Sequence, residues 1–130
     1  MKKFDRSSDE RFAKYVSEAI DDLPGNIIER LSNVAIVIED EPSPEQRKKL
    51  NLRKGEALLG LYEGIPQTER GSSYQGLPDK ITIFKNSIEL SAETKEDIKR
   101  IVRTTVWHEV AHHFGMEEDE VKIEEKRRGY

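Results

Sequence analysis

The stretch WHEVAHHFGMEEDE, residues 107–120, contains all three histidines of this 130-residue chain. His108 and His112 are four positions apart, and Glu109 lies between them. A helix turns by about 100° per residue, so side chains at i and i+4 project from the same face. The spacing therefore predicts two imidazoles side by side on one helical face, with a carboxylate next to them.

The residues before this stretch predict the helix that carries it, over residues 94–114. Thr94 and Asp97 are spaced as a capping box at the N-terminal end. Gly115 suits the C-terminal end, where a left-handed backbone commonly stops a helix. The histidines are thus expected at the C-terminal end of a long helix near the end of the chain.

Two imidazoles at i and i+4 can both bind one Zn²⁺, at about 2.0–2.1 Å each. Glu109 is not placed to bind the same ion, but it can accept a proton from a water at the open coordination position. This is the chemistry of the H-E-x-x-H motif. The sequence therefore predicts one zinc ion held by His108 and His112, with Glu109 as the general base.

The segment HEVAHHFGMEE, residues 108–118, resembles the extended zincin signature H-E-x-x-H-x-x-G-x-x-(H/D). The chain as a whole resembles the small bacterial zincin-like minimal metallopeptidases over residues 10–122. The matching segments are LLGLYEG, GIPQTERGSSYQGLPDKITIFKNSI and TVWHEVAHHFG. The resemblance implies an α+β zincin-like fold, in which a small mixed sheet of three to four strands packs on helices and the active helix lies near the C-terminus.

Carried over by position, the resemblance makes His108 and His112 the first two ligands and Glu109 the base. The third-ligand position falls on Glu118, where the family more often has Asp and the metzincins have His. Glu is one methylene longer, so an oxygen ligand is retained with looser geometry. Four other carboxylates are alternatives for the third ligand, with Asp119 the first of them: Asp119, Glu120, Glu124 and Glu125.

Two residues of the motif region have structural interpretations. His113 points about 100° away from His112, so we expect a buried, hydrogen-bonded side chain rather than a ligand. Trp107 is expected to pack in the core. Met116 lies inside the ligand turn, and too little chain follows for the C-terminal subdomain of metzincins, so the expected cleft is shallow and open.

Hydrolysis of a carbonyl compound needs a donor for the developing oxyanion. The candidates are Tyr62 and, in the long segment IPQTERGSSYQGLPD, Arg70 and Tyr74. A peptide substrate in zincins usually adds to a sheet edge. Residues 58–62 or 80–85 could form that edge, and the sequence does not choose between them.

The remainder of the chain predicts alternating helices and strands. The segment NVAIVIED is a β-branched run continuous enough to indicate burial on both faces, whereas KITIFKN alternates Ile81 and Ile83 with Thr82 and Phe84. The C-terminal EEKRRGY is interpreted as a solvated chain end. The other expected elements are a helix from a Ser7/Glu10 capping box to Pro24, a short helix over 25–33, a helix begun by Ser43 and Pro44, and a strand within 56–64.

Length and composition fit a single domain, residues 1–130. A net charge of −4 gives no reason to expect nucleic acid or an anionic membrane as partner, and the longest apolar run, VAIVI, is too short to cross a bilayer. Without a recognisable signal sequence we expect a cytoplasmic protein, monomeric or a small homo-oligomer, and the resemblance implies a bacterial one; the lack of cysteines excludes disulfides and thiolate ligands only.

The leading functional hypothesis is a zinc-dependent peptidase acting on a peptide or protein substrate. The peptide bond as target comes from the resemblance, because the motif itself indicates only metal-assisted hydrolysis. The alternative is a metal-bearing peptide-binding module with little or no turnover, suggested by the missing lower subdomain and by Glu at the third position.

Overall fold

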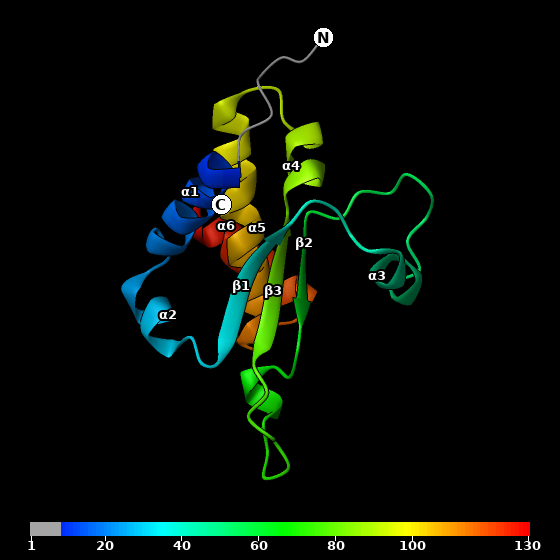
Figure 1. Ribbon diagram of the computed structural model, residues 1–130. Helices are drawn as coiled ribbons and strands as arrows, with labels where there is room; N and C mark the ends of the chain where they lie inside the picture. Colours follow the sequence, from blue (N-terminus) through cyan, green and yellow to red (C-terminus); the bar gives the residue numbers. More distant parts are fainter. Residues whose placement is uncertain (1–8) are drawn as a thin grey trace.

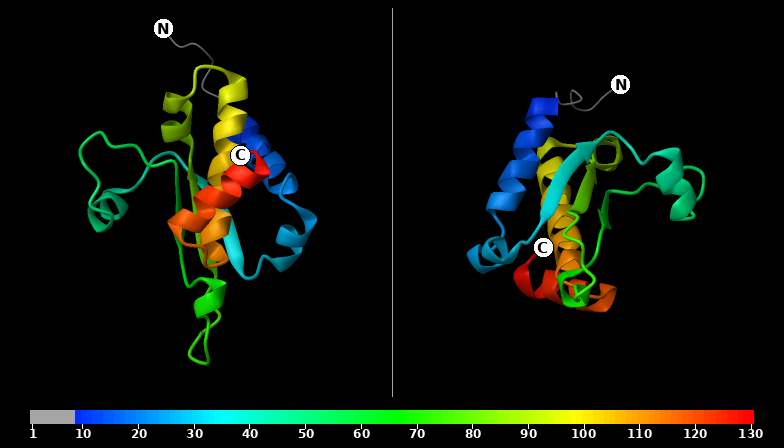
Figure 2. Two further views of the ribbon diagram at one scale, coloured as in Figure 1. Left: turned by 180° about the vertical axis from the view of Figure 1, so that it is seen from behind. Right: turned by 60° about the horizontal axis from the view of Figure 1, so that its bottom comes forward.

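The computed structural model describes residues 9–130, so the expected cap at Ser7 lies outside the described residues. A small mixed sheet is packed against helices, and α5 and α6 lie in front of it when the molecule is viewed from behind (Figures 1 and 2). In chain order the elements are α1 Asp9–Asp21, α2 Gly25–Arg30, β1 Val34–Glu39, α3 Pro44–Lys49, β2 Gly60–Glu63, the 3-10 turn η1 Gln67–Glu69, β3 Asp79–Phe84, α4 Lys85–Ser91, α5 Lys95–His113 and α6 Glu118–Arg128.

The strands are ordered β1-β3-β2 across the sheet. β1 runs parallel to β3, with Val34 opposite Asp79, and β2 runs antiparallel to β3, with Gly60 opposite Ile83. β3 is therefore central, and β1 and β2 are edge strands. The predicted α+β class with a small mixed sheet is confirmed, and three strands form it within residues 9–130.

Burial on both faces belongs to β3 rather than to the apolar run of β1, so the expectation for NVAIVIED was wrong. In β1, Ala35 is exposed and the other residues are only partly buried. In β3, residues 81–84 are all fully buried, which puts both of its alternating faces inside the protein. The reason is position, because β3 has a strand on each side and β1 has only one.

The core lies between the sheet and α5, and α1 also packs against that helix. The apolar stripe of α5, including Val102, Val106 and Val110, is fully buried, as is Trp107. From α1, Phe12 and Val16 complete the same core. This packing fixes α5 in the sheet-facing orientation that the motif requires.

The short helices and the strand predicted over residues 25–64 are present, but some of them are shorter than expected. Ser43 caps α3 and Pro44 begins it, as expected, and Gln46 completes a capping box that was not predicted. β2 begins only at Gly60, and α2 ends at Arg30. Two helices were not predicted: α4, which continues directly from β3, and α6, which includes most of the tail expected to be a solvated end. No helix among residues 9–130 is long and apolar enough to cross a membrane.

Candidate metal centre

The helix α5 carries the histidines in its last two turns, and both of its ends are fixed by local structure. The Thr94 hydroxyl accepts from the backbone N–H of Asp97 at 3.1 Å, and the Asp97 carboxylate accepts from the Thr94 N–H, so the predicted capping box is confirmed. After Phe114 the chain turns at Gly115, whose φ of 89° favours glycine. That turn leads the chain back past the histidines and into α6.

The turn brings Glu118 against both imidazoles. One carboxylate oxygen, Oε1, lies 3.0 Å from His108 Nε2 and 2.9 Å from His112 Nε2. The ligand atoms of the three residues all lie within 4.8 Å of one another. The side chains expected as zinc ligands are thus brought together at one point, with the two ring centroids 5.0 Å apart.

The other nitrogen of each ring is held by its own partner. His108 Nδ1 lies 2.9 Å from a carboxylate oxygen of Glu125, and His112 Nδ1 lies 3.2 Å from the carbonyl oxygen of Met116. Both partners are acceptors, so they favour the tautomer with the proton on Nδ1. Each Nε2 then carries a lone pair that is directed toward Glu118. A metal-binding histidine usually donates its other ring N–H to an acceptor in this way.

These donors fit a zinc ion. Ligands at about 2.0–2.1 Å in tetrahedral geometry are about 3.3 Å apart, close to the two Nε2–Oε1 distances. Two imidazoles and one carboxylate are a common donor set of catalytic zinc sites, which leave a fourth position open. Burial lowers the pKa of His108, but the carboxylates of Glu125, Glu109 and Glu118 more than offset it, so the pKa lies above its usual value.

Glu109 lies on the sheet side of the imidazoles. Its side chain is 8% exposed, and burial raises the pKa of its carboxyl, against the effect of the neighbouring histidines and of a hydrogen bond from the Tyr62 backbone N–H. Gly60 makes this approach of β2 to α5 feasible, because a Cβ there would meet Thr105 at 2.6 Å and Glu109 at 3.2 Å.

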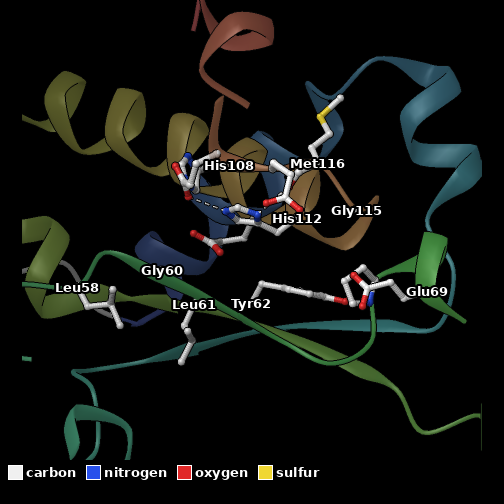
Figure 3. Close-up of a pocket in the computed structure, with 13 residues that line it drawn as sticks. Leu58, Gly60, Leu61, Tyr62, Glu69, His108, His112, Gly115 and Met116 are labelled. Atoms are coloured by element: carbon white, nitrogen blue, oxygen red, sulfur yellow. Dashed lines mark hydrogen bonds and ion pairs between the residues drawn. The ribbon is translucent and has the colours of Figure 1, made fainter. Parts of the chain in front are cut away.

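A cleft of about 490 Å³ opens between these side chains and β2 (Figure 3). The histidines face it from α5, and the Tyr62 side chain lies along it on β2. Among residues 9–130, no lysine or arginine lines it. The residues that line it are Leu58, Gly60, Leu61, Tyr62, Pro66, Glu69, His108, Glu109, His112, Gly115, Met116, Glu117 and Glu118.

Of the three predicted oxyanion donors, only Tyr62 lines the cleft. Its hydroxyl donates to Asp79 at 2.5 Å, and burial, together with that hydrogen bond, raises its pKa. Arg70 pairs with Asp79 and donates to the carbonyl oxygen of Ile65. Tyr74 donates to Leu77 and lies under the Arg70 guanidinium, 4.7 Å away. Arg70 also donates to the carbonyl oxygen of Ser32, and the Tyr74 hydroxyl accepts from the Asn33 amide, so both side chains are engaged away from the cleft.

Among the alternatives to Glu118, none is brought to the Nε2 atoms of the histidines. Glu120 accepts from the Glu117 N–H in a capping box that starts α6, and Glu124 pairs with Arg127 and Arg128. Asp119 is exposed beside Glu118 and is not part of the group that could hold an ion. Glu125 reaches the Nδ1 side of His108 only.

His113 is buried and hydrogen-bonded, as expected, and its partner is a residue that the sequence did not single out. Its Nδ1 lies 2.8 Å from Asp79, while its Nε2 faces the N–H of Ser32 at 3.3 Å and the amide of Gln67 at 2.9 Å. Two donors at Nε2 require a lone pair there, so His113 is neutral and donates from Nδ1. Burial lowers the pKa of His113, which also favours the neutral form.

Two contributors to the site, Asp79 and Gly60, were missed, and Glu125 was named only as an alternative third ligand rather than as the partner of His108 Nδ1. Asp79 lies at the start of the most buried strand, where an acid is unusual and invites a question about its partner. Gly60 interrupts a strand, a common sign of close backbone approach. Glu125 follows Glu118 by seven positions, two helical turns, so both lie on one face once α6 is recognised. Recognising α6 as a helix would have been enough to place Glu125 on the same face as Glu118.

The family model described as zincin-like metallopeptidase matches residues 31–127, and the chain belongs to this family. Among solved structures, a conserved hypothetical protein from Thermus thermophilus has a similar fold, with a TM-score of 0.57 and 23% identity. The match covers 83% of this chain and 94% of the other. No curated protein matches the chain.

Proposed function

We propose that the protein is a zinc-dependent peptidase, with His108, His112 and Glu118 as ligands of one ion and Glu109 as the general base. The single observation that carries the proposal is the convergence of the three donors beside a buried carboxylate, in a cleft open to one sheet edge. A bound zinc ion supplies Lewis acidity, which lowers the pKa of a coordinated water and polarises a carbonyl.

Glu109 performs the proton transfers in this proposal. Its carboxylate takes the proton from the attacking water and returns it to the leaving amine. The raised pKa that burial produces suits both steps, because it brings the acid form closer to neutral pH. The Tyr62 N–H holds the carboxylate on the cleft side of β2.

The substrate pairs with β2 in this proposal. β3 has strands on both sides, so the choice between the two candidate edges falls on β2. The carbonyl of Leu59 accepts from the N–H of Phe84 at 2.9 Å. Because bonded and unbonded positions alternate in an antiparallel ladder, the backbone groups of Gly60 and Tyr62 then face away from β3. Since the Tyr62 N–H is engaged by Glu109, an extended peptide can pair with the backbone groups of Gly60 and with the carbonyl of Tyr62.

Main-chain pairing gives loose sequence preference, and the open cleft accommodates a peptide or a protein segment. Of the predicted oxyanion donors only Tyr62 lines the cleft, but its hydroxyl donates to Asp79, so it could serve an oxyanion only by exchanging that acceptor. We further propose that the protein acts in the cytoplasm, as the absence of a recognisable signal sequence leads us to expect, and in a bacterial cell, as the family resemblance implies.

The test is hydrolysis of a peptide library by the zinc-loaded protein, with and without a chelator, alongside Glu109→Gln. We expect Glu109→Gln to lose at least about a hundredfold in turnover, the range of general base catalysis, and to keep its zinc affinity. Cleavage by Glu109→Gln at the wild-type rate would refute the assigned base.

A metal-bearing binding module is the competing function, and the exposure of Glu118, 56% of its side chain, is the observation that favours it. It predicts no cleavage by the wild-type protein and unchanged peptide retention by Glu109→Gln. Peptide retention measured on immobilised zinc-loaded protein distinguishes the two functions.

A further inference from the structure

The helix α6 carries much of the metal centre but has little apolar contact of its own. Among its residues only Val121 is buried, and Ile123 is 65% exposed. Yet α6 supplies Glu118 to both Nε2 atoms and Glu125 to His108 Nδ1. Something other than a buried face must hold this helix in place on α5.

The end of α6 supplies that contact. Gly129 has a φ of 78°, which ends the helix and turns the chain back. The ring of Tyr130 then stacks on Trp107, with centroids 5.6 Å apart and an angle of 13° between the planes. The Arg103 guanidinium lies 4.4 Å from the Tyr130 ring, and that of Arg128 lies 4.9 Å from the Trp107 ring.

This contact is connected to the metal centre by two short links. The N–H of Tyr130 donates to the backbone carbonyl of Glu125 at 2.9 Å, and the side chain of Glu125 holds His108 Nδ1. Trp107 directly precedes His108 and is fully buried, so it is a fixed point of α5. Trp107, Tyr130, Glu125 and His108 thus form a closed ring of contacts.

We propose that Tyr130 is a positioning residue of the metal centre, which acts through Glu125 by fixing the end of α6 on Trp107. Without the stack, the last turn of α6 loses its main contact with α5, and the Glu125 carboxylate is no longer held at His108. The inference rests on the proposed metal site, but it does not depend on peptide hydrolysis.

The test measures the zinc affinity of the protein by competition with a chromophoric chelator. Tyr130→Ala is expected to weaken zinc binding about tenfold, the lower end of the effect of removing a partner of a metal-binding histidine. Tyr130→Phe retains the stack and should bind as the wild type does. Ile123→Ala, an exposed change on the same helix, is the matched control and should also bind normally.

A double-mutant cycle with Glu125→Ala tests the route. If Tyr130 acts through Glu125, the double variant binds zinc no more weakly than Glu125→Ala alone. A structural contribution independent of Glu125 would instead make the two losses add, and that outcome overturns the proposal. Zinc binding by Tyr130→Ala within twofold of the wild type also overturns it.

If Tyr130→Ala does not fold, Tyr130→Leu keeps apolar bulk without the stacked ring, and the same tenfold loss is expected. A wild-type protein that binds no zinc would refute the proposed function itself. Normal zinc binding without dependence on Tyr130 would refute only this inference, so the two failures are distinguishable.

Discussion

Asp79 is expected to be the most costly single polar side chain to remove from this protein. It is 1% exposed, and it accepts from Tyr62, Arg70 and His113 on one oxygen and from the Ile65 N–H on the other, at 2.5 to 3.0 Å. These bonds join β3 to the end of α5, to β2 and to the long loop. The carboxylate is therefore the common acceptor that holds the back of the cleft together.

The expected magnitudes follow from these contacts. Asp79→Ala removes a buried carboxylate that four donors share, one of them the Arg70 guanidinium, which should lower the free energy of unfolding by about 3–5 kcal/mol. Asp79→Asn keeps one oxygen, but its amide group faces a donor, so the loss should be about 1–3 kcal/mol. Either is a large part of the roughly 5–15 kcal/mol that stabilises a domain.

The assay is urea unfolding of the zinc-free protein followed by the fluorescence of Trp107, the one tryptophan of the chain and fully buried. Glu39→Gln is the matched control, because Glu39 pairs with Lys80 at 3.1 Å with both side chains about 40% exposed, and its loss should cost less than about 1 kcal/mol. If Asp79→Ala is no more destabilising than Glu39→Gln, the buried carboxylate is not the acceptor that holds these elements.

The remaining predictions concern pH, zinc and packing. Burial raises the pKa of Asp79, but its hydrogen-bond partners more than offset this and hold the pKa below 3.8. The stability that the ionised Asp79 adds is therefore fully present above pH 3.8 and is lost as the pH falls through the folded pKa. In acid unfolding curves, the difference in stability between wild type and Asp79→Asn should shrink over that range. Free zinc at a hundred times its dissociation constant should add about 2.7 kcal/mol to the free energy of unfolding, and His112→Ala should abolish this gain in the same urea assay. Gly60→Ala should cost about 1–3 kcal/mol in that assay and lower turnover with zinc affinity unchanged, because a Cβ there meets Thr105 and Glu109; an unchanged turnover would contradict the close approach. Gly115→Ala should weaken zinc binding, because its φ of 89° is strained for alanine and the turn that places Glu118 must shift; equal affinity in a chelator competition would count against it.

Local pattern was sufficient for the helix that carries the motif. The capping box at Thr94, the histidines on one face and the turn at Gly115 are all set by residues within a few positions of one another. The same holds for the direction of His113, since successive side chains on a helix are separated by a fixed angle. Local rules also gave the capped start of α3 at Ser43.

Long-range pairing decided the rest. The strand order β1-β3-β2 places the apolar run of β1 at one edge of the sheet and β2 at the other edge, beside Glu109. No local sequence pattern encodes which strands become neighbours. The partners of the site, Asp79 for His113 and Glu125 for His108, are 34 and 17 positions away from the side chains that they hold. The amino-acid sequence by itself determined which side chains could bind a metal and from which helical face. Only the tertiary structure decided which carboxylates meet them, because a hydrogen bond across elements depends on where packing of the whole core leaves each backbone.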